Sequence, residues 1–291
     1  MAEKQRFVSD MTLRQAVAAG VRALCDAGIE EAQLDANLLL AHVIGGDRLT
    51  LVRDADRFLG AAELDNYSKL IDERKERKPA SRLIGRREFW SLELQISDEV
   101  FDPRPDSETL IDAALAQMPN ETGNYVIADF GTGSGCLLLA VLAERPGAWG
   151  LGLDYSHASV QQAMKNARNL RLYDRARFMV GDWGKALSGS FDLILTNPPY
   201  VTTAETENLD PEVRYHDPKL ALDGGDDGLS AYRAMAPHLH RLLKPGGRAV
   251  LECGYWQANH VACILTSAGL RIAETHRDLA GIDRCLCAEK Q

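Results

Sequence analysis

The sequence lacks the features that mark a membrane-spanning, secreted or metal-binding protein. Its longest uninterrupted apolar run, Cys136 to Ala143, is too short to cross a bilayer. No pair among its six cysteines has the Cys-x-x-Cys spacing, and no His-Glu-x-x-His string occurs. The first residues carry charges instead of an apolar signal core. We therefore expect a cytoplasmic protein with reduced thiols and no structural metal.

Basic residues are also in the minority. The 33 Lys and Arg against 42 Asp and Glu give a formal net charge of −9, which opposes nonspecific binding to nucleic acid or to anionic membranes. The segment 74–87 is the exception, because it holds seven basic residues and one acidic residue. We interpret it as a solvated linker, with a contact surface for an acidic partner or RNA as the alternative.

The 291 residues are enough for about two domains. Apolar residues recur at helical spacing over 11–78, where Thr12 and Gln15 have the pattern of a capping box. The segment 89–97 alternates like a half-buried strand, and from Tyr125 onward short apolar strands alternate with helices. We predict a helical domain over 1–84, a hairpin linker over 85–104, and an α/β domain with a doubly wound parallel sheet over 105–291.

A glycine-rich string follows the first strand of this α/β pattern: Gly131-Thr132-Gly133-Ser134-Gly135. Glycines there allow the backbone to turn sharply and lie close to a cofactor. Nineteen residues further on, the second strand ends at Asp154, where a carboxylate can accept hydrogen bonds from both ribose hydroxyls of a nucleoside cofactor. NAD and S-adenosylmethionine both qualify, but the glycine spacing differs from the dinucleotide pattern and favours S-adenosylmethionine.

Two further strand ends supply polar and aromatic residues. Asp182 and Trp183 follow the third strand, where the carboxylate could accept from an adenine amine and the indole could stack on the ring. Asn197-Pro198-Pro199-Tyr200 follows the next strand, and its two prolines make that segment rigid and remove two backbone donors. The Asn197 side-chain oxygen and the Pro198 carbonyl could accept both N–H bonds of a planar amine or amide, with Tyr200 against its face. We expect Asn197, Pro198 and Tyr200 to be catalytic and all four residues to bind substrate.

These strings resemble S-adenosylmethionine-dependent methyltransferases that act on planar nitrogen, which include adenine-amine and glutamine-amide enzymes. Further strings across the whole chain resemble the bacterial peptide chain release factor glutamine methyltransferase (HemK) family. They include Gly85-Arg-Arg-Glu-Phe-Trp90, Pro103-Arg-Pro-Asp-Ser-Glu108, Ala221-Leu-Asp-Gly-Gly-Asp-Asp-Gly-Leu229, Leu251-Glu-Cys-Gly254 and Ala280-Gly-Ile-Asp-Arg284. Phe101-Asp102 departs from the family, which usually has two aliphatic residues there.

The resemblance implies a seven-stranded class I methyltransferase sheet and a helical domain that recognises the substrate. It also implies methylation of the glutamine side-chain amide in the Gly-Gly-Gln loop of class 1 release factors, which tunes translation termination. Gly131 to Gly135, Asp154, Trp183 and Asn197 would bind S-adenosylmethionine. Glu108 and Glu252 are additional candidates for the cleft, with a structural ion pair as the alternative for each. We expect a monomer without stable nucleic-acid or membrane binding.

Three other interpretations remain open at this point. A sister enzyme that methylates a glutamine of a ribosomal protein would carry the same catalytic string, so the N-terminal domain must discriminate between the two. An adenine-amine methyltransferase is disfavoured by the acidic net charge and by the lack of a separate target-recognition domain. A binding module without catalysis is disfavoured by the intact Asn197-Pro-Pro-Tyr200.

Overall fold

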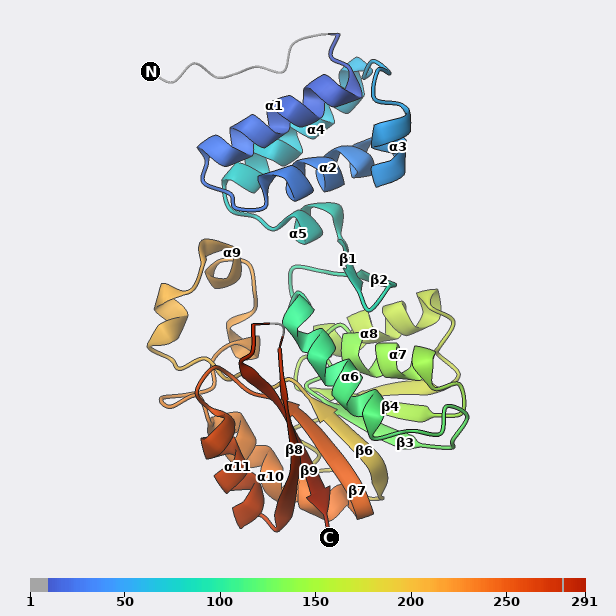
Figure 1. The fold of residues 1–291 in the computed structure, drawn as a ribbon, viewed down its shortest axis with the longest axis vertical. Coiled ribbons are helices and arrows are strands. Elements are labelled where there is room, and N and C mark those ends of the chain that lie inside the picture. The colour runs from blue at the N-terminus through green and yellow to red at the C-terminus, as the bar shows by residue number, and fades with distance from the viewer. Residues whose placement is uncertain (1–9, 279) are drawn as a thin grey trace. The chain divides into compact units, whose positions relative to one another are not determined.

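The computed structural model describes residues 10–278 and 280–291. The chain divides into two compact units, Met1–Gly85 and Arg86–Gln291 (Figure 1). Within the described residues, no helix has the length and apolar character needed to cross a membrane. The same residues contain no cluster of three His, Cys, Asp or Glu side chains that could hold a metal ion.

The first unit is helical throughout its described part. Thr12 caps its first helix as predicted, since its hydroxyl accepts from the Gln15 backbone N–H at 3.3 Å and the Gln15 side chain accepts from the Thr12 N–H at 2.9 Å. Leucine and alanine side chains from successive helices form one buried core. The helices are α1 (Leu13–Asp26), α2 (Ala32–Val43), α3 (Arg48–Arg53), α4 (Ala61–Lys75) and α5 (Ala80–Ile84).

The basic segment 74–87 is not a uniformly solvated linker. Arg74 is buried inside the helical unit, where its Nε donates to the Asp35 carboxylate at 2.7 Å. Arg77 donates to the Ala27 carbonyl at 3.1 Å, and residues 80–84 of the segment form α5, within the predicted helical domain 1–84. The interpretation as a linker was therefore wrong for this part of the segment, because buried partners for its charges lie far away in the sequence.

The second unit begins with an antiparallel hairpin, β1 (Arg86–Phe89) and β2 (Leu92–Gln95). The hairpin packs on α8 (His157–Asn169) through the Asn166 side chain, which accepts from the Gln95 N–H at 2.9 Å and donates to the Gln95 carbonyl at 3.1 Å. The hairpin thus belongs to the α/β unit, whereas the sequence suggested a separate linker over 85–104.

The main sheet has seven strands in the order β5-β4-β3-β6-β7-β9-β8. The five strands from β5 to β7 are parallel, and β9 runs antiparallel to both β7 and β8. This arrangement confirms the predicted doubly wound sheet, in which the strand order reverses next to β3. The strands are β3 (Val126–Phe130), β4 (Trp149–Asp154), β5 (Ala176–Val180), β6 (Phe191–Thr196), β7 (Leu243–Glu252), β8 (Leu270–Arg277) and β9 (Asp283–Lys290).

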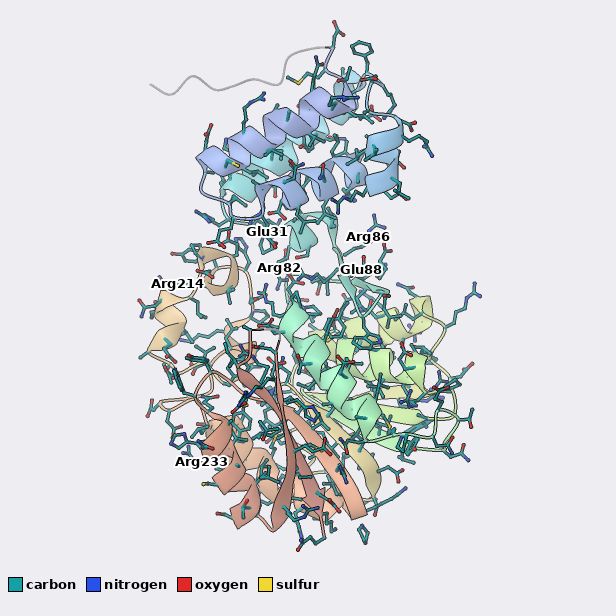
Figure 2. The ribbon with its side chains drawn as sticks, viewed as in Figure 1. Glu31, Arg82, Arg86, Glu88, Arg214 and Arg233 are labelled. Atoms are coloured by element: carbon teal, nitrogen blue, oxygen red, sulfur yellow. The ribbon has the colours of Figure 1, made fainter. Side chains whose placement is uncertain are left out.

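Helices cover both faces of this sheet (Figure 1). Alternate residues of one strand face opposite cores: Leu193 joins the core beneath α6 and α7, and Ile194 joins the core beneath α10 and α11. Many charged side chains lie on the outside, as for Arg233 of α10, which pairs with Asp227 at 2.5 Å (Figure 2). The remaining elements are α6 (Glu108–Ala116), α7 (Cys136–Glu144), α9 (Pro211–Arg214), α10 (Ser230–Leu242), α11 (Ala258–Ser267) and the short 3₁₀ helices Pro105–Ser107, Glu205–Asn208 and Lys219–Ala221.

Candidate active site

The carboxyl ends of the parallel strands meet at one edge of the sheet, where a cavity of about 530 Å³ opens. This volume lies in the range of small-molecule sites, and the edge is where doubly wound sheets bind ligands. The structure brings eleven of the twelve residues predicted for the site to this cavity: Gly131, Thr132, Gly133, Ser134, Asp154, Asp182, Trp183, Asn197, Pro198, Pro199 and Tyr200. The twelfth, Gly135, packs below it, since a Cβ there would lie 3.1 Å from Ala163 and Leu139 side-chain atoms.

The glycine loop lies between β3 and α7 and is closed by backbone hydrogen bonds. The Thr132 N–H donates to the Leu153 carbonyl of β4 at 2.8 Å, which ties the loop to the neighbouring strand. Gly131 and Gly133 have φ of +72° and +54°, a region that residues with a Cβ rarely adopt. A Cβ on Gly133 would meet nothing closer than 4.0 Å, so this backbone faces open space.

Two carboxylates flank the loop, and their environments differ. Asp129 is fully buried and accepts from the Thr132 hydroxyl at 2.6 Å, and burial, aided by the charge of Asp154, raises its pKa to about 7. Asp154 is partly exposed to the cavity, and each of its carboxylate oxygens accepts one backbone N–H, from Gly133 and Ser156, both at 2.8 Å. Burial raises the pKa of Asp154, and these two hydrogen bonds oppose the rise. Asp129 is a structural group, whereas Asp154 presents an acceptor to the cavity.

Asp182 and Trp183 form another part of the wall. Trp183 has a φ of +43°, and its ring lies beside the glycine loop, 3.7 Å from where a Cβ on Gly131 would stand. Asp182 forms an ion pair with Lys185 at the surface. The indole therefore supplies a flat apolar face next to the glycines.

The segment Asn197 to Tyr200 leaves β6 and enters the cavity wall. The Gln257 side chain donates to the Tyr200 carbonyl at 2.9 Å, and the Val201 N–H donates to the Leu222 carbonyl at 3.0 Å. Asn197 Nδ2 donates to the Ser107 hydroxyl at 3.0 Å. The segment is thus held by residues that lie both before and after it in the chain.

Sequence reasoning missed Ser107 as a site residue and left the roles of Glu108 and Glu252 open. The Ser107 hydroxyl also lines the cavity and donates to Glu252, which is buried at the end of β7. Glu108 accepts from the Trp90 N–H at 2.9 Å and so fixes the hairpin. For Glu252 the sequence did contain a signal. This glutamate directly follows the apolar run Ala249-Val-Leu251, and carboxylates are rarely buried without partners.

The cavity fits S-adenosylmethionine. The cofactor carries an aminoacyl group, a ribose and an adenine, and the wall offers an open glycine backbone, a carboxylate acceptor and an indole in sequence along the strand ends. Residues 106–212 match the family model described as methyltransferase small domain. The second unit is accordingly a class I S-adenosylmethionine-dependent methyltransferase.

Curated relatives extend the similarity to the full chain. A release factor glutamine methyltransferase from Rhodospirillum rubrum is 44% identical over 97% of this chain and 86% of its own, and one from Caulobacter vibrioides is 43% identical over 96% and 97%. Residues 15–85 match the model described as PrmC N-terminal domain. A solved release factor-specific protein-(glutamine-N5) methyltransferase from Alicyclobacillus acidocaldarius is 25% identical, with a TM-score of 0.39, over 65% of this chain and 94% of that one. The chain belongs to the release factor glutamine methyltransferase family.

Proposed function

We propose that this protein methylates the side-chain amide nitrogen of the glutamine in the Gly-Gly-Gln loop of class 1 peptide chain release factors. The observation that carries the proposal is the placement of Asn197-Pro198-Pro199-Tyr200 on the wall of the same cavity as the glycine loop and Asp154. The relatives named above are called release factor glutamine methyltransferases, and the similarity covers nearly their whole length. We infer the protein substrate from the names of these relatives, and the methyl-transfer reaction from the residues that line the cavity.

The cofactor-binding residues are proposed to be Gly131 to Ser134, Asp154, Asp182, Trp183 and Asn197. When bound, S-adenosylmethionine supplies an electrophilic methyl group. Asp154 would accept hydrogen bonds from the ribose hydroxyls, Trp183 would cover the adenine and Asp182 would accept from its amine. The glycine loop would approach the aminoacyl part. Gly135 supports this loop through packing and is not proposed to touch the cofactor.

The residues proposed to bind the substrate act on a poor nucleophile, since an amide nitrogen shares its lone pair with the carbonyl. The Asn197 side-chain oxygen and the Pro198 carbonyl would each accept one N–H of the target, which fixes the plane and direction of the nitrogen. The same two acceptors stabilise the positive charge that develops on the N–H bonds as the new N–C bond forms. Tyr200 would pack against the flat face of the amide. Transfer would break the bond between the methyl group and the cofactor's sulfur, which would keep the electron pair, and the methylated amide would release one proton to solvent.

The helical unit is proposed to recognise the release factor, and the protein is proposed to act as a cytoplasmic monomer without a nucleic-acid partner. The test is the transfer of labelled methyl to a purified class 1 release factor, beside a copy with the Gly-Gly-Gln glutamine replaced by alanine. Label on the first alone is the expected result. Label on a ribosomal protein and on neither release factor would refute the substrate and support the sister glutamine methyltransferase.

A further inference from the structure

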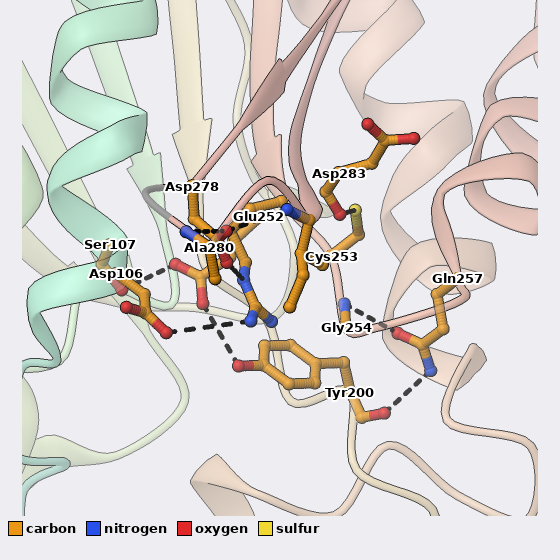
Figure 3. Close-up of polar contacts among 12 residues, drawn as sticks. Asp106, Ser107, Tyr200, Glu252, Cys253, Gly254, Gln257, Asp278, Ala280 and Asp283 are labelled. Carbon is orange, nitrogen blue, oxygen red and sulfur yellow. Dashed lines mark hydrogen bonds and ion pairs between the residues drawn. The ribbon is translucent and has the colours of Figure 1, made fainter.

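A chain of buried hydrogen bonds lies behind the proposed acceptor Asn197. Asn197 Nδ2 donates to Ser107 Oγ at 3.0 Å, and Ser107 Oγ donates to Glu252 Oε2 at 2.6 Å. The Tyr200 hydroxyl donates to the other oxygen, Oε1, of Glu252 at 3.2 Å. Figure 3 shows Ser107 and Tyr200 on opposite sides of Glu252. Ser107 is 3% exposed and Glu252 is 2% exposed, so water does not compete for the hydrogen bond between them, whereas Asn197 and Tyr200 are half-buried at the cavity.

The direction of these hydrogen bonds fixes the orientation of the Asn197 amide. A serine hydroxyl has one hydrogen to donate, and the ionised form of Glu252, which Arg284 and the Ser107 and Tyr200 hydroxyls stabilise, can only accept. Because the Ser107 hydrogen points at Glu252, its oxygen can only accept from Asn197. The NH₂ group of Asn197 must therefore face Ser107, which leaves its oxygen on the other side of the amide. The reversed amide would place two acceptors against each other.

The position of Ser107 in the fold supports a role beyond local structure. It is the N-cap residue of α6, where a serine side chain ordinarily accepts from a backbone N–H of the first turn. Among the described residues this cap has no such side-chain hydrogen bond, and the hydroxyl contacts Glu252 and Asn197 instead. The hydroxyl of this residue therefore serves the two side chains and not the helix end.

The burial of Glu252 also requires compensation. Burial raises the pKa of Glu252, while the hydrogen bond from Ser107, the positive charge of Arg284 and the hydrogen bond from Tyr200 oppose the rise. Arg284 in turn is held by Asp278 at 3.2 Å and lies 3.7 Å from Asp106. The acceptor behind Ser107 is thus embedded in a network that spans three segments distant in sequence.

We propose that Ser107 and Glu252 are positioning residues that hold the Asn197 amide with its oxygen directed at the substrate nitrogen. This inference rests on the proposed function, because it assigns the freed oxygen to the target amide. Without Ser107, the Asn197 amide can rotate by half a turn and present its own NH₂ to the substrate NH₂. Two donors would then face each other, and the nitrogen would lose one of the two contacts that orient it.

The test compares Ser107→Ala and Ser107→Thr, with Thr196→Val as a matched control. Thr196 is buried directly before Asn197, and its hydroxyl donates to the Phe130 carbonyl at 2.8 Å without touching the amide. We expect Ser107→Ala to lower kcat about tenfold to a hundredfold, the range expected for loss of a charge-linked hydrogen bond. The Kd for S-adenosylmethionine and the KM for the release factor should change less than about threefold.

Ser107→Thr keeps the hydroxyl and should restore kcat to within about threefold of wild type. Thr196→Val should lower the melting temperature with kcat nearly unchanged, which separates lost stability from lost positioning. Equal kcat values for Ser107→Ala and wild type would overturn the proposal. A Ser107→Thr variant as slow as Ser107→Ala would overturn it as well.

A second measurement does not depend on activity. The side-chain NH₂ signals of Asn197, assigned by their disappearance in Asn197→Ala, should exchange slowly with solvent in the wild type and much faster in Ser107→Ala. Fast exchange in both proteins would contradict the hydrogen bond itself. If wild-type protein labels the release factor and Ser107→Ala matches it, the proposed function stands and only the positioning role falls. If wild type labels no release factor, the proposed function and this inference fall together.

Discussion

Replacement of Asp154 tests the proposed cofactor site most directly. Each oxygen of this carboxylate already accepts one backbone N–H, from Gly133 and Ser156, both at 2.8 Å, and the residue lines the cavity, where ribose hydroxyls would donate to it. Hydrogen bonds to a charged group contribute about 1.5–3 kcal/mol. The contribution of one such contact, about 2–3 kcal/mol, is the lower bound for the two ribose contacts together. Asp154→Ala should therefore weaken S-adenosylmethionine binding at least about 30-fold.

Asp154→Asn should not rescue this loss. An asparagine has one acceptor oxygen, so its NH₂ must face the N–H of either Gly133 or Ser156. A donor facing a donor leaves both without a partner, which costs about 1–3 kcal/mol. We expect Asp154→Asn to bind the cofactor at least as weakly as Asp154→Ala and to lower the melting temperature of the α/β unit.

Isothermal titration calorimetry with S-adenosylmethionine measures these changes. Asp182→Asn is the matched control, because its carboxylate is at the surface beside Lys185 and an amide oxygen can still accept from an adenine amine. Its Kd should stay within about fivefold of wild type. A Kd for Asp154→Ala within about threefold of wild type would refute the assignment of Asp154 to the ribose.

Three further predictions concern single residues. Asn197→Ala should lower the rate of methyl transfer, measured by single-turnover labelling, about 10²- to 10³-fold. Its Kd for S-adenosylmethionine should stay within about tenfold of wild type. A rate loss below about tenfold would contradict the role of Asn197 as an acceptor. Gly20→Ala should destabilise the helical unit by about 1–3 kcal/mol in urea unfolding, because the new Cβ would stand 2.1 Å from the Tyr67 hydroxyl. This loss should exceed the gain of about 1 kcal/mol that alanine brings to a helix over glycine. A more stable variant would contradict that packing. The raised pKa of Asp129, about 7 against 3.8, means that the folded state binds the proton more tightly, so stability falls as pH rises from about 4 to 7. Asp129→Asn should remove this loss, and its stability relative to wild type should grow by up to about 1.4 kcal/mol per pH unit; parallel pH profiles in chemical denaturation would argue against the shift.

Local signals in the sequence predicted most of the fold. Some elements depend only on neighbours within a few residues and can therefore be recognised from the sequence alone. They include the capping pair Thr12 and Gln15 and the apolar strands from β3 to β7. Strand β8, Leu270–Arg277, was not predicted. It is an edge strand with mostly polar, partly exposed residues, and only its pairing with β9 makes it a strand. Arg74 was misread for a related reason, because its partner Asp35 lies 39 residues away.

The same distinction applies to the site. Residues at the ends of parallel strands must share one edge of the sheet, so Gly131, Asp154, Trp183 and Asn197 could be assigned to one cavity from their order alone. The contact of Ser107 with Glu252 joins residues 145 positions apart and has no local pattern. Gly135, predicted from the same string, packs against Ala163 and Leu139, a contact that the glycine pattern alone does not indicate.

The string Ala221 to Leu229 shows how a segment without catalytic groups can still serve the site. Gly224 and Gly228 lie directly behind the Asn-Pro-Pro-Tyr segment: a Cβ on Gly224 would stand 2.8 Å from the Pro199 carbonyl oxygen, and one on Gly228 would stand 2.4 Å from that of Tyr200. Gln257 donates to the Tyr200 carbonyl oxygen from the same side. Prolines cannot anchor their own segment through backbone N–H groups, because they have none. The contacts of Gly224 with the Pro199 carbonyl, and of Gly228 and Gln257 with the Tyr200 carbonyl, therefore add a constraint that the prolines alone do not supply.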